Sequence, residues 1–204
     1  MDSSKGAVLR IFQPDLFWTT VQTTFVIGSF MSIYYSVNYW YPTFLREAGR
    51  PTLPFLALFN VGAIVGTAFW GRLSETRLWR RGAVTLTILL GMVALRFYLY
   101  STDATMLMVG AAMMGAFGMG VWGMAPAYTV ERFPTAVRGV GPGFCYHAGA
   151  AIGAVMPALL GALQDRGFGM VDGMSAAMVT SGVVALVAIW SGPETRGRSL
   201  DEHA

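Results

Sequence analysis

Residues 110–163 decide the fold of this chain: they read GAAMMGAFGMGVWGMAPAYTV (110–130), ERFPTAVR (131–138) and GVGPGFCYHAGAAIGAVMPALLGAL (139–163). The two outer runs are apolar, rich in glycine and interrupted by proline, and a short charged turn joins them. In water such helices would be weak, because glycine lowers helix propensity and proline breaks the hydrogen-bond ladder. In a bilayer the backbone must bond internally, and small residues let neighbouring helices approach closely. The stretch therefore predicts a pair of membrane helices at the moving centre of a bundle.

The composition of the whole chain indicates the same class. Of 204 residues, 54% are hydrophobic and only 12% are charged, and the mean hydropathy is +0.53. Soluble domains carry roughly 25% charged residues, so the sequence predicts a membrane protein that crosses the bilayer several times. The net charge of +3 does not indicate nucleic-acid binding, because the basic residues are scattered among short loops and form no stripe.

Six apolar segments follow one another along the chain, each close to the ~20 residues that cross the hydrocarbon core. We expect them at residues 17–41, 53–70, 82–100, 104–129, 139–163 and 171–190. The predicted fold class is therefore an all-α membrane protein with six transmembrane helices. The same division gives a lead-in over 1–16, a helical bundle over 17–191 and a tail over 192–204.

Lysine and arginine are distributed unevenly between the two sides of such a bundle. If both termini are cytoplasmic, the inner side holds ten of these residues and the outer side four. Inner loops of membrane proteins carry the excess of basic residues. We therefore expect an integral protein of the cell membrane, inner or plasma, with both termini in the cytoplasm.

Three short motifs lie on the predicted inner turns. They are Gly71-x-Leu73-x-Glu75 followed by Arg80-Arg81, then Glu131-x-Phe133-Pro134-Thr135-x-x-Arg138, then Pro193-Glu194-Thr195-Arg196-Gly197. In order, spacing and sidedness they resemble three motifs of the major facilitator superfamily. The first motif departs from the family pattern, since it is one residue longer and Leu78 or Trp79 stands where a glycine is expected.

The resemblance implies half of a larger fold. The superfamily has twelve helices in two six-helix halves, and the six helices here correspond to helices seven to twelve. The expected partners are a small-molecule substrate and a proton, the lipid bilayer, and either an N-terminal six-helix half or a second copy of the chain.

The subgroup within the superfamily is indicated by two further stretches. The run YWYPTFL (39–45) and the segment GFCYHAG (143–149) are similar to those of carboxylate and aromatic-acid symporters, whereas the tail over 193–202 also resembles sugar porters. The resemblance implies transport of a small organic acid by alternating access, coupled to protons. A sugar or polyol symporter is the alternative, and a non-transporting membrane module or an inactive remnant is the alternative of another class.

Polar and aromatic residues inside the predicted helices suggest a substrate-binding wall. The expected members are Tyr34, Tyr35, Asn38, Asn60, Trp122 and His147. Tyr34 and Asn38 are four residues apart and so share a helix face. His147 is an ionisable side chain deep in a predicted helix, which makes it the proton-coupling candidate. Simpler alternatives are a neutral, hydrogen-bonded His147 and a Trp122 that only packs against a neighbouring helix.

The charged residues of the inner turns suggest a latch that holds the inner face closed. The expected members are Gly71, Glu75, Arg77, Arg80, Arg81, Glu131, Arg138, Glu194 and Arg196. Inside-positive topology would explain the arginines without any gating, but it does not require the carboxylates.

The sequence shows no nucleophile and base set, no metal-ligand spacing and no phosphate-binding loop. Cys145 and His147 are two residues apart and so point to different faces of a helix. We therefore expect neither an enzyme nor a bound cofactor or metal.

Overall fold

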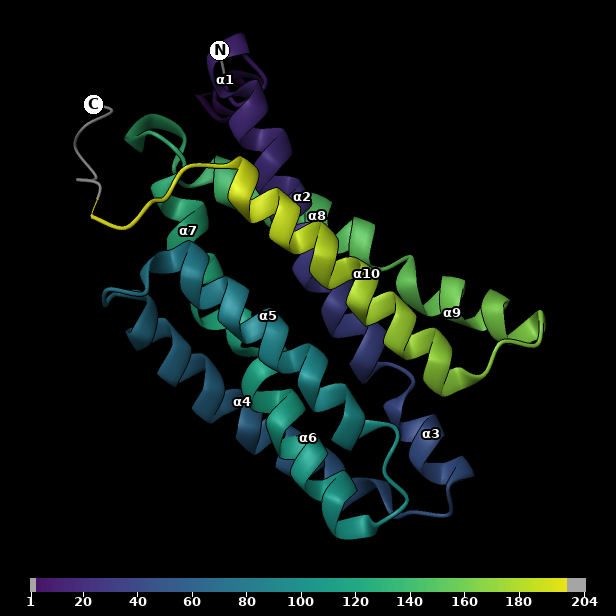
Figure 1. Ribbon diagram of the computed structural model, residues 1–204. Coiled ribbons are helices and arrows are strands. Elements are labelled where there is room, and N and C mark those ends of the chain that lie inside the picture. The colour runs from purple at the N-terminus through teal and green to yellow at the C-terminus, as the bar shows by residue number, and fades with distance from the viewer. Residues whose placement is uncertain (1–2, 198–204) are drawn as a thin grey trace.

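The computed structural model of the chain describes residues 3–197, and within them every regular element is a helix (Figure 1). The elements are α1 (Ser3–Arg10), α2 (Pro14–Asn38), α3 (Tyr41–Glu47), α4 (Thr52–Ser74), α5 (Trp79–Tyr98), α6 (Ala104–Gly118), the 3-10 helix η1 (Gly120–Gly123), α7 (Ala125–Glu131), the 3-10 helix η2 (Thr135–Val137), α8 (Val140–Gly153), α9 (Met156–Asp165) and α10 (Met170–Ser191).

Six spans in this part of the chain are long and apolar enough to cross a membrane, which confirms the predicted fold class. Their bounds agree with the expected segments to within a few residues, except that the first span continues through α3 to Glu47. Of the expected lead-in and tail, residues 1–2 and 198–204 lie outside the described residues.

The first, fourth and fifth spans are interrupted rather than continuous. The second helix of each pair begins with a proline in its first turn, namely Pro42 in α3, Pro126 in α7 and Pro157 in α9. Proline fits the first turn of a helix, where its missing N–H has no partner to lose. Each proline therefore marks a place where one membrane span bends into a new helix.

The helices form two groups of three. In one group α6 packs against both α4 and α5, and in the other α2 packs against both α8 and α10 (Figure 1). The two groups meet where α5 lies beside α10. Both ends of the described chain lie at the same end of the bundle, together with the 75–78 loop and the turn before α8. We call this the terminal end, and the opposite end, which carries α3, the distal end.

Glycines allow the helices of each group to touch backbone to backbone. A Cβ atom at Gly66 of α4 would collide with the backbone of Ala116, and one at Gly115 of α6 would collide with the carbonyl oxygen of Phe59. In the other group, a Cβ at Gly149 of α8 would lie 2.8 Å from the backbone nitrogen of Gly28. Small residues at such seams replace the hydrophobic driving force that helices lack in lipid.

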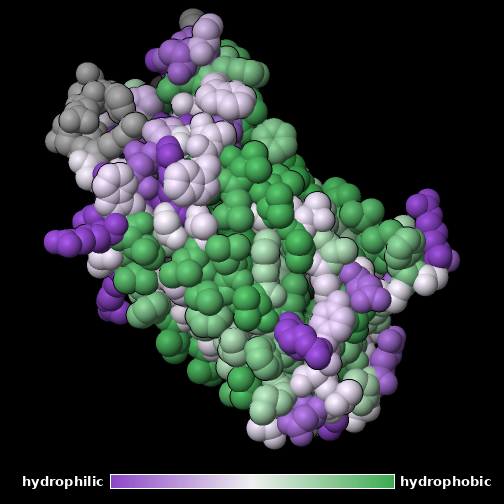
Figure 2. Space-filling view, viewed as in Figure 1, coloured by the Kyte–Doolittle hydropathy of each residue, from purple (hydrophilic) through white to green (hydrophobic). Residues whose placement is uncertain are grey.

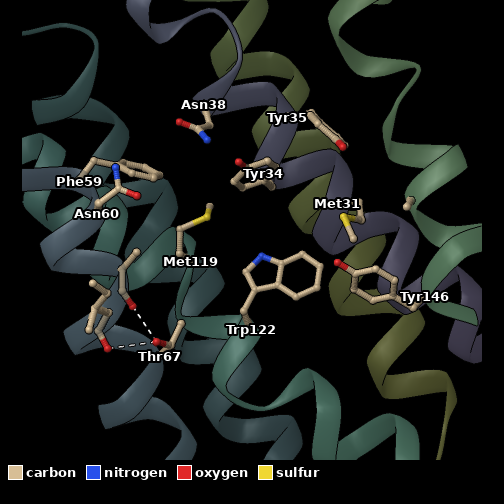
Figure 3. A pocket seen from close by; sticks show the side chains of 13 residues that line it. Met31, Tyr34, Tyr35, Asn38, Phe59, Asn60, Thr67, Met119, Trp122 and Tyr146 are labelled. Atoms are coloured by element: carbon tan, nitrogen blue, oxygen red, sulfur yellow. Dashed lines mark hydrogen bonds between the residues drawn. The ribbon is translucent and has the colours of Figure 1, made fainter. Parts of the chain in front are cut away.

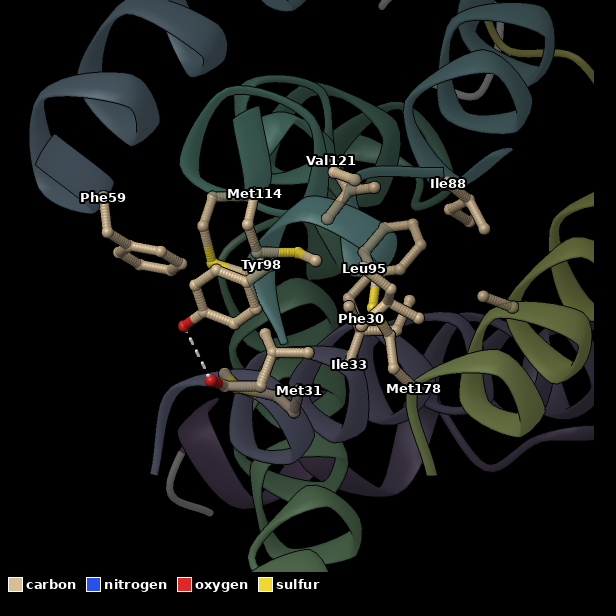
Figure 4. Packing of buried hydrophobic residues seen from close by; sticks show 14 of the residues in the cluster. Phe30, Met31, Ile33, Phe59, Ile88, Leu95, Tyr98, Met114, Val121 and Met178 are labelled. Atoms are coloured by element: carbon tan, nitrogen blue, oxygen red, sulfur yellow. Dashed lines mark hydrogen bonds between the residues drawn. The ribbon is translucent and has the colours of Figure 1, made fainter. Parts of the chain in front are cut away.

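A buried hydrophobic cluster joins the two groups (Figure 4). The ring of Tyr98 on α5 stacks on that of Tyr41 on α3, with 3.9 Å between ring centroids. The Tyr98 hydroxyl donates a 2.9 Å hydrogen bond to the carbonyl oxygen of Val37 at the end of α2. This carbonyl lies near the break between α2 and α3, where the last carbonyl groups of a helix have no intrahelical partner. The Tyr98 hydroxyl supplies that partner.

Apolar side chains cover much of the surface between the two hydrophilic ends (Figure 2). The exposure is uneven, because only 17% of the hydrophobic window in the spans of α4 and of α8 is buried, against 67% in the first span. On α4, Val61, Ile64, Val65 and Phe69 are each more than half exposed. In this chain α4 and α8 therefore present the apolar faces that are covered least.

The glycine seam between α2 and α8 yields a stability prediction with a control on the same helix. Gly149→Ala places a methyl group against the α2 backbone, whereas nothing lies within 4 Å of a Cβ at Gly143. Overpacking of this kind costs about 1–3 kcal/mol. We expect Gly149→Ala to lower the melting temperature of the purified chain in detergent and Gly143→Ala to leave it unchanged or raise it. Equal changes in melting temperature for the two substitutions would contradict close backbone contact at Gly149.

Candidate functional site

A cavity of about 510 Å³ opens on the face between α4 and α8 (Figure 3). Its lining comes from α2, α4, the segment around η1, and α8. The lining residues are Met31, Tyr34, Tyr35, Asn38, Phe59, Asn60, Ala63, Ile64, Thr67, Met119, Trp122, Tyr146 and Ala150. A cavity of this volume is in the range of small-molecule sites.

Helix periodicity brings most of these side chains together. On α2, Tyr34 and Asn38 lie one turn apart, and on α4 Asn60, Ala63 and Thr67 follow the same rule. The side-chain nitrogen of Asn60 donates to the carbonyl oxygen of Leu56 at 2.7 Å, which leaves its side-chain oxygen to face the cavity.

Trp122 occupies the middle of the cavity because its backbone lies in the break between α6 and α7. Its ring meets those of Phe30 and Tyr146 at centroid distances of 6.3 Å, in steep rather than stacked orientations. Trp122 and Tyr146 also line a second, smaller cavity of about 280 Å³, which continues toward the terminal end between α7 and α8. The two aromatic side chains therefore stand between the two cavities.

Five of the six residues expected in the substrate wall line the larger cavity. They are Tyr34, Tyr35, Asn38, Asn60 and Trp122. His147 does not line it, because its neighbour Tyr146 takes that place. The His147 side chain is exposed on α8, with its ring 5.6 Å from that of Tyr146 and perpendicular to it.

Tyr146 lines the cavity in place of His147 because of the way α8 packs on α2. Small residues spaced four apart, Gly141, Cys145, Gly149 and Gly153, form the buried face of α8. Successive helical residues differ by about 100° in direction, so this face fixes which neighbour points into the cavity. The four-residue spacing is visible in the sequence and is the signal that identifies Tyr146. Phe59 and Met119 carry no comparable signal.

Charged residues at the terminal end gather around a buried arginine. Arg80 is 4% exposed, and its guanidinium binds the carboxylate of Glu131 through two hydrogen bonds, of which the Nε–Oε2 bond is 2.7 Å long. A second carboxylate, Glu75, lies 2.8 Å from the same guanidinium. These contacts connect the loop after α4, the start of α5 and the end of α7.

Glu194 completes this cluster by capping the N-terminus of α5. Its carboxylate accepts hydrogen bonds from the backbone nitrogens of Arg80 and Arg81, at 3.2 and 3.1 Å. It also accepts from the backbone nitrogens of Thr195 and Arg196. Burial alone would raise the pKa of Glu194, but these N–H donors outweigh it and hold the pKa below the ordinary 4.5.

The turn that leads into α5 explains the departure of the first motif from the family pattern. Trp79 has a φ of +60°, a left-handed conformation that glycine adopts without strain and tryptophan does not. The expected glycine position is therefore occupied by a residue held in a glycine-like conformation. Gly71, at the start of the motif, lies where a Cβ would be 3.0 Å from the carbonyl oxygen of Gly123.

The other residues expected in the latch have separate surroundings. The guanidinium of Arg81 lies 5.6 Å from the ring centroid of Trp190. Arg77 is exposed in the 75–78 loop, and Arg138 donates to the carbonyl oxygen of Phe133 at 3.4 Å. The structure thus brings Glu75, Arg80, Glu131 and Glu194 into one cluster.

A buried network that the sequence did not indicate lies beside the cluster. Gln22 on α2 is 2% exposed and donates to the hydroxyl of Tyr128 on α7 at 3.0 Å and to the carbonyl oxygen of Ala188 on α10 at 2.7 Å. Its side-chain oxygen accepts a 3.0 Å hydrogen bond from Arg132. The network ties three helices together at the terminal end.

Among residues 3–197 no group of three or more His, Cys, Asp or Glu side chains is arranged to hold a metal ion.

Several curated proteins are similar to this chain. The cis,cis-muconate transport protein of Acinetobacter baylyi is 30% identical over 76% of the chain and 39% of its own length. The putative niacin/nicotinamide transporter NiaP of Bacillus subtilis is 26% identical over 72% and 37%. The sialic acid transporter NanX of Escherichia coli is 24% identical over 79% and 40%.

The chain spans about 40% of the length of these relatives. No family model and no solved structure matches it. The relatives are transporters, which points away from enzymatic activity.

The buried ion pair yields a second prediction. Removing one partner of a buried pair leaves an uncompensated charge and costs about 3–5 kcal/mol. We expect Glu131→Gln to lower the unfolding free energy of the purified chain by about 3 kcal/mol, because it leaves Arg80 buried without its main partner. Arg77→Gln, at an exposed neighbouring position, is the control and should change it by less than about 0.5 kcal/mol. Similar decreases in unfolding free energy for both variants would show that the buried pair stabilises the fold no more than an exposed charge does.

The capping carboxylate gives a pH prediction. The pKa of Glu194 is lowered in the folded chain, so its contribution to stability is complete above the ordinary pKa and is lost as the pH falls through the native one. We expect the wild type to be more stable than Glu194→Gln at pH 7, and the difference to shrink below about pH 4.5. Thermal unfolding between pH 3 and 8 measures it, and a difference that grows with acidity would contradict the assignment.

Proposed function

The chain is homologous to metabolite transporters of the major facilitator superfamily and corresponds to their C-terminal half, and from this premise we propose that it forms half of a carrier for a small organic acid. The carried compound is a carboxylate or an aromatic acid, and the transport is alternating access coupled to protons. The relatives named for muconate and for niacin support this substrate class.

The observation that carries the proposal is the position of the larger cavity. It opens on the face between α4 and α8, the two spans with the lowest buried share. Polar groups such as Asn38 and Asn60 are costly to expose to lipid. A second six-helix unit over this face would close the cavity and cover both helices. That unit is an N-terminal half or a second copy of the chain.

The charged cluster fits a latch at the cytoplasmic side, with both termini in the cytoplasm. Arg80, Glu131 and Glu75 join the start of α5 to the end of α7 and to the loop after α4. The free-energy difference between an open and a closed inner face depends on the contacts that only one of the two states makes. Breaking a buried ion pair is a large enough difference to bias that equilibrium.

His147 remains the proton-coupling candidate in this proposal. It is exposed on α8 beside Tyr146, on the face that a second unit would cover.

Uptake into proteoliposomes tests the proposal. We expect radiolabelled benzoate or muconate to accumulate under an imposed inward proton gradient when the chain is reconstituted with a second half, and more weakly or not at all when it is alone. His147→Ala should reduce gradient-driven uptake at least ten-fold while leaving exchange without a gradient intact. His147→Gln, which retains hydrogen bonding but cannot carry a proton across, should behave like His147→Ala.

Other outcomes reject parts of the proposal. Uptake of sugars instead of acids would overturn the substrate class. Uptake by the chain alone would identify a second copy as the partner. Absence of uptake in every reconstitution, with folding verified by a cooperative thermal transition, would reject transport.

A further inference from the structure

The lining of the larger cavity is neutral and strongly aromatic. All thirteen lining residues lack a formal charge, and five of them are aromatic: Tyr34, Tyr35, Phe59, Trp122 and Tyr146. The wall offers a carboxylate only neutral hydrogen-bond donors, such as the hydroxyls of Tyr34, Tyr35 and Tyr146, and no cation to offset the cost of removing its charge from water. This half of the site is therefore poorly suited to the charged end of an organic acid.

Trp122 is the aromatic side chain that extends furthest into this space (Figure 3). Its two ring neighbours meet it at interplanar angles of 76° and 66°, and neither is stacked upon it in parallel. An indole in this position can take a flat ring in an offset stack. The face of an aromatic ring is electronegative, so the favoured offset places a carboxylate attached to that flat ring beyond the edge of the indole and not over its face.

Neutral polar groups stand at the rim of the same wall. The side-chain oxygen of Asn60 is left over after its nitrogen bonds to Leu56. The Asn38 amide points into the open space above Trp122 in Figure 3. It makes no side-chain hydrogen bond within the described residues. Amides of this kind recognise uncharged substituents or ring heteroatoms and do not neutralise a carboxylate.

We propose that this half of the carrier binds the planar, unsaturated framework of the acid against Trp122, and that the carboxylate points out of the open face to be neutralised by a group outside these thirteen residues. The inference rests on the proposed function, because it assumes that the cavity is the substrate site. It divides recognition in two: the chain selects for flatness and unsaturation, and whatever covers the open face selects for negative charge.

Three probes separate these two selections: benzoate, benzamide and cyclohexanecarboxylate. Benzamide keeps the ring but not the charge, and cyclohexanecarboxylate keeps the charge but not the flat ring. Binding is measured by isothermal titration to the full chain in lipid nanodiscs, with and without the second half. The wild type should prefer benzoate over cyclohexanecarboxylate by about three- to ten-fold, the range expected of one aromatic stack.

Substitution of Trp122 is the decisive comparison. Trp122→Leu should remove the preference for the flat ring while leaving the ratio of benzoate to benzamide affinity unchanged. Trp122→Phe should retain part of the preference, which guards against a misfolded leucine variant. Trp18→Leu, at a tryptophan that is 61% exposed outside the cavity, is the matched control and should change neither ratio.

The inference is overturned if Trp122→Leu keeps the ring preference, if it alters the benzoate to benzamide ratio as strongly, or if none of the three probes binds the wild type. Its failure is distinguishable from failure of the proposed function. Uptake with a ring preference independent of Trp122 would retain the carrier and reject the stacking wall. A Trp122-dependent preference without any uptake would retain the wall and reject the carrier.

Discussion

Close contact between helix backbones is the constraint on which the rest of this structure depends. In lipid, apolar side chains gain little by leaving one apolar neighbour for another, so helices associate through tight packing. Gly66 and Gly115 let α4 and α6 touch along their backbones, and Gly149 does the same for α8 on α2. These seams set the position of the side chains beside them. Asn60 faces the cavity because the seam glycines of α4 point elsewhere, toward α6. Tyr146 lies beside the glycine face of α8, whereas His147 lies opposite that face.

Much of this arrangement follows from the sequence alone. Length and apolarity predict six spans, and periodicity places Tyr34 with Asn38 on one face of α2. The choice between Tyr146 and His147 required knowing which face of α8 packs on α2, and the prediction favoured the ionisable residue over the one that the packing selects. Gln22 could not be assigned, because its partners, Tyr128 and Ala188, are more than a hundred residues away. No motif marks Gln22 or its partners, so nothing in the sequence was a reason to bring them together.

The charged cluster shows the same division between local and distant information. Motifs in the sequence predicted that Glu75, Arg80 and Glu131 belong to one group, since each lies on a turn at the same side. They did not predict that Arg80 would be almost completely buried, nor that Glu194 would accept four backbone hydrogen bonds, two of them from the N-terminus of α5. Burial changes the energetics, because an exposed pair contributes about 0–1 kcal/mol whereas breaking a buried one costs several.

A single short helix connects the cluster to the cavity. α7 begins at Ala125, three residues after Trp122, and ends at Glu131, which is held by Arg80. Trp122 lies in the 3-10 segment before α7, where regular α-helical hydrogen bonding is interrupted. Within α7 the backbone bonds keep the seven residues rigid, whereas the 3-10 segment can deform at smaller cost. The ion pair at the end of α7 and the aromatic pair before its start therefore belong to one interrupted span, so the same short helix positions Glu131 for Arg80 and Trp122 between the two cavities.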